Sequence, residues 1–117
     1  MARLIVEAEA TGGTGASSGV AKPGNQLPLY VVVSVTHGNG TAQTGLSSAN
    51  FQVEPIIVAP GGGGVTIAQV GQLQSGVYLV EIVPITTATW QLGRYIFWVA
   101  VSHGTDHGQT VCSVFVD

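Results

Sequence analysis

The chain has 117 residues, of which 45% are hydrophobic and 8% are charged, and its formal net charge is −3. Only three residues are Lys or Arg, too few for the basic patch that a nucleic-acid-binding protein or an anionic-membrane-binding protein requires. A high apolar fraction with few charges is opposite to the composition of disordered chains, so we expect one packed domain over residues 1–117. Few charges also leave little repulsion between copies, which favours association.

No apolar run reaches the ~18 residues of a membrane-spanning helix. The start, MARLIVEAEA, lacks the hydrophobic core of a signal peptide, so we expect either a cytoplasmic protein or a processed extracellular fragment. Cys112 is the only cysteine, which excludes a disulfide within the chain.

Apolar residues alternate along the chain with period two, and the alternating segments are rich in Val, Ile, Tyr and Phe. This pattern is typical of strands, and glycines and prolines separate the segments. The pattern predicts strands over 3–9, 28–36, 50–58, 64–70, 76–83, 94–102 and 109–116. With no helical stripe between them, these strands predict an all-β, immunoglobulin-like sandwich of two antiparallel sheets. The long connection before residue 28 holds either an extra edge strand around 19–22 or a mobile stretch.

The run GVAKPGNQLPLYVVVSVTHGNGTAQTGLSSANFQV and the later Gly76-Val-Tyr78 and Gly93-Arg-Tyr95 carry a resemblance. A Pro-Gly turn leads into a strand, an Asn-Gly turn follows it, and Gly-x-Tyr opens two later strands. In these features residues 19–117 resemble bacterial immunoglobulin-like domains and their filamin-type relatives. The resemblance implies a β-sandwich architecture, which does not fix a function.

Tyr95 and Cys112 are expected to stabilise the fold. Tyr95 stands near the start of its strand, so we expect a tyrosine corner, with a ligand-binding role as the alternative. Cys112 alternates with Val114 and Val116, so we expect a buried, unreactive thiol.

The stretch VSHGTDHGQT places His103, Asp106 and His107 close together in sequence. One interpretation is a polar hairpin turn with solvated histidines, since Gly104, Asp106 and Gly108 are all turn formers. The other interpretation depends on the topology of a sandwich. His37 opens the loop after the second strand, and that loop lies at the same end of a sandwich as the loop that carries His103, Asp106 and His107. Imidazoles bind zinc, copper or nickel, so His37, His103 and His107 form a candidate metal site, with Asp106 as a further ligand.

Trp90 and Trp98 are candidate ligand-binding residues, because exposed tryptophans stack on sugars and on partner surfaces. Trp98 alternates with Ile96 and Ala100, so the strand over 94–102 is apolar on both faces. One face packs in the core, and the other needs a cover. The long segment before residue 28, a partner protein or a second copy are the alternatives.

Patterns for catalysis are missing: there is no Gly-x-Ser-x-Gly elbow, and the six acidic residues form no local pair. We therefore expect no enzyme and no cofactor. The predicted function is a non-catalytic interaction or assembly module that contacts another protein or a second copy. The alternative is a carbohydrate- or metal-binding module that uses the end carrying His37, His103, Asp106 and His107.

Overall fold

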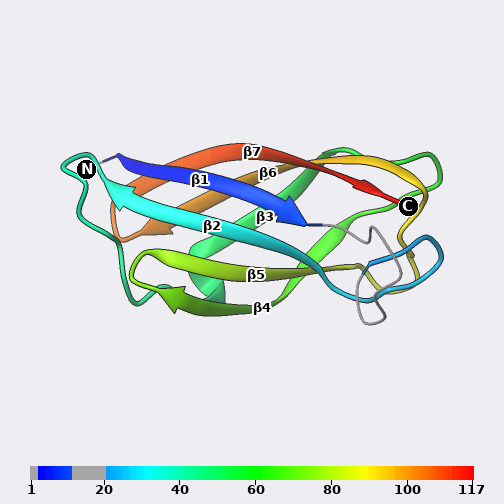
Figure 1. Ribbon diagram of the computed structural model, residues 1–117, viewed down its shortest axis with the longest axis horizontal. Coiled ribbons are helices and arrows are strands. Elements are labelled where there is room, and N and C mark those ends of the chain that lie inside the picture. Colours follow the sequence, from blue (N-terminus) through cyan, green and yellow to red (C-terminus); the bar gives the residue numbers. More distant parts are fainter. Residues whose placement is uncertain (1–2, 12–20) are drawn as a thin grey trace.

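A computed structural model describes residues 3–11 and 21–117, and these form seven strands and one short 3-10 helix (Figure 1). In chain order the elements are β1 Leu4–Thr11, β2 Leu29–His37, η1 Ser48–Asn50, β3 Phe51–Ile57, β4 Val65–Gln74, β5 Val77–Pro84, β6 Gly93–His103 and β7 Asp106–Val116. The expected all-β fold is confirmed, and all seven expected strands are present. The observed bounds differ most at β4, which continues to Gln74, and at β7, which already begins at Asp106.

The strands form two antiparallel sheets, one ordered β1-β2-β5-β4 and the other β3-β6-β7. Figure 1 shows the two sheets as stacked layers whose strands run along the length of the molecule. The arrangement is a β-sandwich of one four-stranded and one three-stranded sheet. Short connections join β4 to β5 and β6 to β7 within a sheet, while the chain crosses between the sheets from β2 to β3, from β3 to β4 and from β5 to β6.

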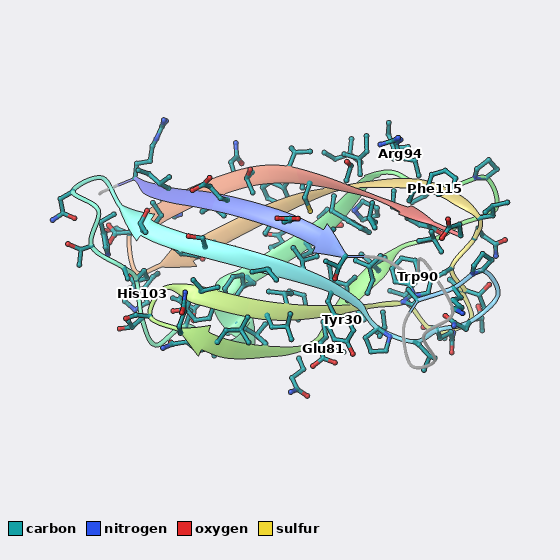
Figure 2. All side chains as sticks on the ribbon, viewed as in Figure 1. Tyr30, Glu81, Trp90, Arg94, His103 and Phe115 are labelled. Carbon is teal, nitrogen blue, oxygen red and sulfur yellow. The ribbon has the colours of Figure 1, made fainter. Side chains whose placement is uncertain are left out.

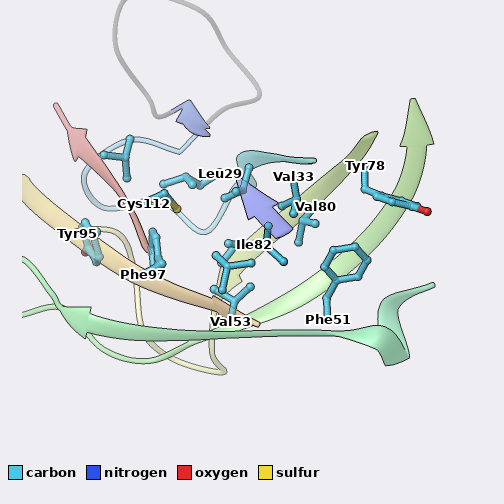
Figure 3. Packing of buried hydrophobic residues seen from close by; sticks show 14 of the residues in the cluster. Leu29, Val33, Phe51, Val53, Tyr78, Val80, Ile82, Tyr95, Phe97 and Cys112 are labelled. Carbon is cyan, nitrogen blue, oxygen red and sulfur yellow. The ribbon is translucent and has the colours of Figure 1, made fainter. Parts of the chain in front are cut away.

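The core lies between the sheets because alternate side chains of each strand point inward. Buried inward residues include Leu29, Val31, Val33 and Val35 of β2, Tyr78, Val80 and Ile82 of β5, and Tyr95, Phe97, Val99 and Val101 of β6. Figure 3 shows part of this cluster, with Leu29, Val80 and Phe97 among its labelled residues. In β7 both faces are apolar, and the buried one carries Cys112, Val114 and Val116. Val111 and Phe115 therefore point outward and remain 54% and 47% exposed.

The two sheets meet along the edge where β1 lies beside β7 (Figure 1). Arg3 forms a parallel bridge to His107, just before β1 begins. At the next residue, Gly108, a side chain would collide with the backbone carbonyl of Leu4 and the side chain of Val6. Glycine at 108 thus permits the close approach of the two edge strands.

The described part of the segment before β2, residues 21–28, packs on the connection between β5 and β6. The backbone N–H of Gly24 donates to the Trp90 carbonyl, and the N–H of Trp90 donates to the Asn25 carbonyl. Ala21 and Lys22 are not in a strand, while residues 19 and 20 of the expected extra strand lie outside the described residues. These contacts place residues 21–28 at one end of the sandwich, around Trp90.

Candidate functional site

A hairpin with a two-residue loop, Gly104 and Thr105, joins β6 to β7. Gly104 has a φ of 62°, the conformation that a tight hairpin needs when glycine comes first in the loop. His103 and Asp106 flank the loop as paired residues of the ladder. Asp106 and His107 therefore belong to β7, which corrects the longer loop expected over these residues.

All three histidines lie at one end of the sandwich, but β1 separates two of them. His37 pairs with Leu4 across β2 and β1, and Arg3 bridges to His107 of β7 on the other side. The backbones of His37 and His107 are thus two strand spacings apart, about 10 Å. Nε2 of His37 instead lies 2.9 Å from Oε1 of Gln43, within hydrogen-bonding distance.

Strand alternation also separates His103 from His107. His103 shares a cross-strand row with Asp106, whereas His107 pairs with Ser102 in the next row, so the two imidazoles start from opposite faces of the sheet. Figure 2 labels His103 at this end of the molecule. Within residues 3–11 and 21–117, no three His, Cys, Asp or Glu side chains are grouped so that they could hold a metal ion. The expected metal set of His37, His103 and His107 is not assembled.

Trp90 is a core residue, which corrects its placement among the ligand-binding candidates. It is 1% exposed, and its Nε1–H donates to the Leu27 carbonyl at 2.7 Å. Its ring packs edge-on against Tyr95 with 5.1 Å between centroids. The hydroxyl oxygen of Tyr95 accepts a hydrogen bond from the backbone N–H of Gln91, four residues upstream, at 2.8 Å. This is the geometry of the expected tyrosine corner.

Trp98 lies on the side of the β3-β6-β7 sheet that faces away from the core, which we call the three-stranded face. The face consists of Gln52, Glu54 and Ile57 of β3, Arg94, Ile96, Trp98, Ala100 and Ser102 of β6, and His107, Gln109, Val111, Ser113 and Phe115 of β7. Cross-strand pairing arranges them in rows, such as Glu54–Trp98–Val111 and Ile57–Ile96–Ser113. Figure 2 shows Arg94 beside Phe115 at the end of the face where β7 finishes. The second apolar face expected for β6 is therefore present.

An open groove of about 1130 Å³ crosses the other end of this face. Nε1 of Trp98 donates to Oε1 of Gln109 at 2.9 Å, which fixes the indole against β7. Asn50 donates through Nδ2 to the Ser102 carbonyl at 2.9 Å and so forms one wall. The other polar side chains along the groove are Arg3, Gln52, Ser102 and His107.

The groove offers an aromatic plane, amides, one guanidinium and one imidazole, and no carboxylate among the described residues that line it. Such a set suits hydrogen bonding and stacking. Trp98 and His107 are candidates from the sequence, whereas Gln52, Gln109 and Asn50 emerge only from the structure. Period two already places Gln52 and Gln109 on outward positions, but their meeting depends on the strand register.

The outward side of the β1-β2-β5-β4 sheet differs from the three-stranded face in the charges it carries. The strands β1, β2, β4 and β5 contain Glu7, Glu9 and Glu81 and no Lys or Arg. Tyr30 is half-buried there and pairs with Glu81 (Figure 2). We call this side the four-stranded face. It is purely acidic, whereas the three-stranded face carries one acid, Glu54, and one base, Arg94.

Cys112 is buried on the core side of β7. Burial raises the pKa of its thiol from 9.0 to about 11, because the thiolate loses hydration there. At neutral pH the sulfur is therefore a neutral packing group.

No protein-family model, curated protein or solved structure matches the chain. Within the described residues, no helix has the length and apolar character needed to cross a membrane. The geometry of the three-stranded face thus provides the evidence for function.

Proposed function

We propose that this protein is a non-catalytic interaction module that binds a protein surface through its three-stranded face. The observation that supports the proposal is the apolar surface there: Val111, Phe115 and Ile57 are each about half exposed and flank the half-buried Ile96 and Trp98. An apolar surface contributed by three adjacent strands is more extensive than the single exposed residues that are ordinary on monomers.

The size of the apolar contribution indicates a weak, reversible contact. Complete burial of a Val, Ile or Phe side chain contributes roughly 1.5–3 kcal/mol, so covering the exposed half of each contributes about 1 kcal/mol. Three such side chains, with smaller gains at Ile96 and Trp98, total about 4–5 kcal/mol, near the lower estimates of the cost of association. Polar contacts at the rim must add to the affinity, and Glu54, Arg94 and Gln109 are placed to make them.

A photo-cross-linking experiment tests the proposal. p-Benzoylphenylalanine replaces the exposed Ser113 at the middle of the three-stranded face, and in a control variant it replaces the exposed Thr66 on the four-stranded face. Irradiation in the cells that make the protein is expected to give polypeptide adducts from position 113 and far fewer from position 66. Equal adducts from both positions, or none from 113, contradict the proposal.

The groove at Trp98 favours a second candidate function, the binding of an oligosaccharide. The indole is anchored through Nε1 to Gln109, and amides of Asn50 and Gln52 lie along the same groove. A sugar ring stacked on the indole would meet amide donors and acceptors on either side.

Fluorescence titration separates this second candidate from the first. Cellohexaose, chitohexaose and xylohexaose are added in turn, and the emission of Trp98 is expected to change with one of them. Trp90 is buried and provides a constant background, and Trp98→Ala is expected to abolish the response. If no oligosaccharide changes the emission at millimolar concentration, this second function is rejected.

A further inference from the structure

We propose that the partner of the three-stranded face is a second copy of this chain, bound face to face about a two-fold axis. This inference rests on the proposed function and names the partner. It depends on the arrangement of Glu54 and Arg94, which are the formal charges of the face and are both exposed. Among the described residues, neither of them takes part in an ion pair.

The register places these two charges in different rows. Glu54 pairs with Trp98, and Arg94 lies four residues earlier on β6, opposite Phe115. At the rise of an extended strand, four residues correspond to about 13 Å. The row between them contains Ile57 and Ile96 and carries no charge.

A two-fold contact is self-complementary, so residue i of one copy meets residue j of the other, and the reverse also holds. An axis along the Ile57–Ile96 row places the Arg94 row of one copy over the Trp98 row of the other. Arg94 then lies over the partner's Trp98, one strand spacing from the partner's Glu54. Each dimer therefore gains two cation–π contacts and two ion pairs, and Phe115 meets the partner's Val111.

The charges of the two faces exclude the other symmetric arrangement. Pairing two four-stranded faces would bring Glu7, Glu9 and Glu81 of both copies together with no Lys or Arg from those strands. Like charges at an interface suppress such pairing. The outward residues of β3, β6 and β7 carry one charge of each sign, Glu54 and Arg94, so these strands are electrostatically complementary to a second copy of themselves. Arg3 lines the groove at one end of the face, and Asp117 follows β7 at the other.

The dimensions of the face predict a reversible dimer. Three strands and about nine residues along β6 give a surface of about 15 Å by 30 Å, or about 450 Å² per copy. Stable interfaces bury about 800 Å² per partner, so we expect a dissociation constant in the micromolar to millimolar range.

Charge reversal tests this arrangement. Sedimentation velocity from about 10 μM to 1 mM is expected to show that Glu54→Arg alone and Arg94→Glu alone each weaken self-association by about tenfold or more. Each single variant opposes like charges at both symmetric sites. An equimolar mixture of the two single variants opposes unlike charges at both sites, so dimers are expected to return. The double variant Glu54→Arg/Arg94→Glu is also expected to dimerise.

Glu7→Arg is the matched control, because it reverses an exposed charge on the four-stranded face. It is expected to leave the dissociation constant unchanged, and circular dichroism confirms that each variant is folded. A chain that is monomeric at 1 mM overturns the inference, as does a mixture of single variants that fails to dimerise. If position 113 still cross-links to a different polypeptide in that case, the proposed function stands and only the second copy is rejected. If position 113 gives no adduct of any kind, both are rejected.

Discussion

Replacing Gly108 with alanine is expected to destabilise the protein by forcing β1 and β7 apart. The φ of Gly108 is not positive, so alanine suffers no backbone strain and the effect is one of space. The new Cβ would stand 2.7 Å from Cγ2 of Val6 and closer still to the carbonyl oxygen of Leu4. Carbon atoms in good contact are about 3.5–4.0 Å apart, so β1 must shift by about 0.8 Å or more.

The expected magnitude follows from the immobility of the atoms that the new methyl meets. One is the backbone carbonyl of Leu4, a residue of β1 that is paired with β2, and the other belongs to a buried valine. Overpacking of this kind costs about 1–3 kcal/mol. For a domain of this size, about 4 °C of melting temperature accompanies each kcal/mol, so a decrease of about 4–12 °C is expected.

Urea unfolding monitored through the emission of buried Trp90 measures the change, and Gly71→Ala provides the matched control. Gly71 also lies in a strand, its φ is not positive, and no heavy atom stands within 4 Å of the added Cβ. Alanine there is expected to be neutral or to stabilise by up to about 1 kcal/mol. If the two variants unfold at the same urea concentration, the β1–β7 contact does not constrain the fold and the reasoning is refuted.

Four further predictions concern the core. Tyr95→Phe removes the hydroxyl that accepts from Gln91 and should lower the free energy of unfolding by about 1 kcal/mol in urea titrations. Trp90→Phe leaves the Leu27 carbonyl without its hydrogen-bond donor and replaces a packed indole with a smaller ring. The free energy of unfolding is expected to fall by about 2–3 kcal/mol. A decrease below about 0.5 kcal/mol would contradict this packing. Cys112 should react with Ellman's reagent at pH 8 at least about a hundredfold more slowly when folded than in urea, because its pKa is raised from 9.0 to about 11. The neutral thiol stabilises the folded state below pH 9, and this contribution is lost as the pH rises from 9 to 11. The urea concentration at the midpoint of unfolding should therefore fall over that pH range in the native chain, and it should fall less in Cys112→Ala.

Period two in the sequence is sufficient to predict the strands, because one face of each strand must be apolar to form the core. The alternation in β2, β5 and β6 predicts the buried residues found there. In β7 the same pattern is ambiguous: Val111 and Phe115 alternate as regularly as Cys112 and Val114 do. Only the packing of the sheets decides which of the two sets is buried.

The candidate site was harder to predict because it depends on register. The three histidines do lie at one end, as the order of loops indicates. Their side chains do not converge, because the two-residue loop at Gly104 places His103 and His107 in successive rows and β1 separates His37 from His107. The groove at Trp98 combines side chains from separate strands with η1, and no local pattern indicates which rows they share.

The edges of both sheets hinder the addition of further strands. At the β3 edge, Pro55 lacks an N–H, and the register shifts between Pro55 and Ile57. The register of β4 with β5 shifts twice, after Ile67 and after Gln72, which bends the other free edge. The remaining edges, β1 and β7, lie against each other. Strand addition, the usual route to open-ended aggregates of a weakly charged β-protein, is thus hindered at these edges. In the proposed dimer, contact through the three-stranded face would end at two copies, because each copy has one such face and would use it fully.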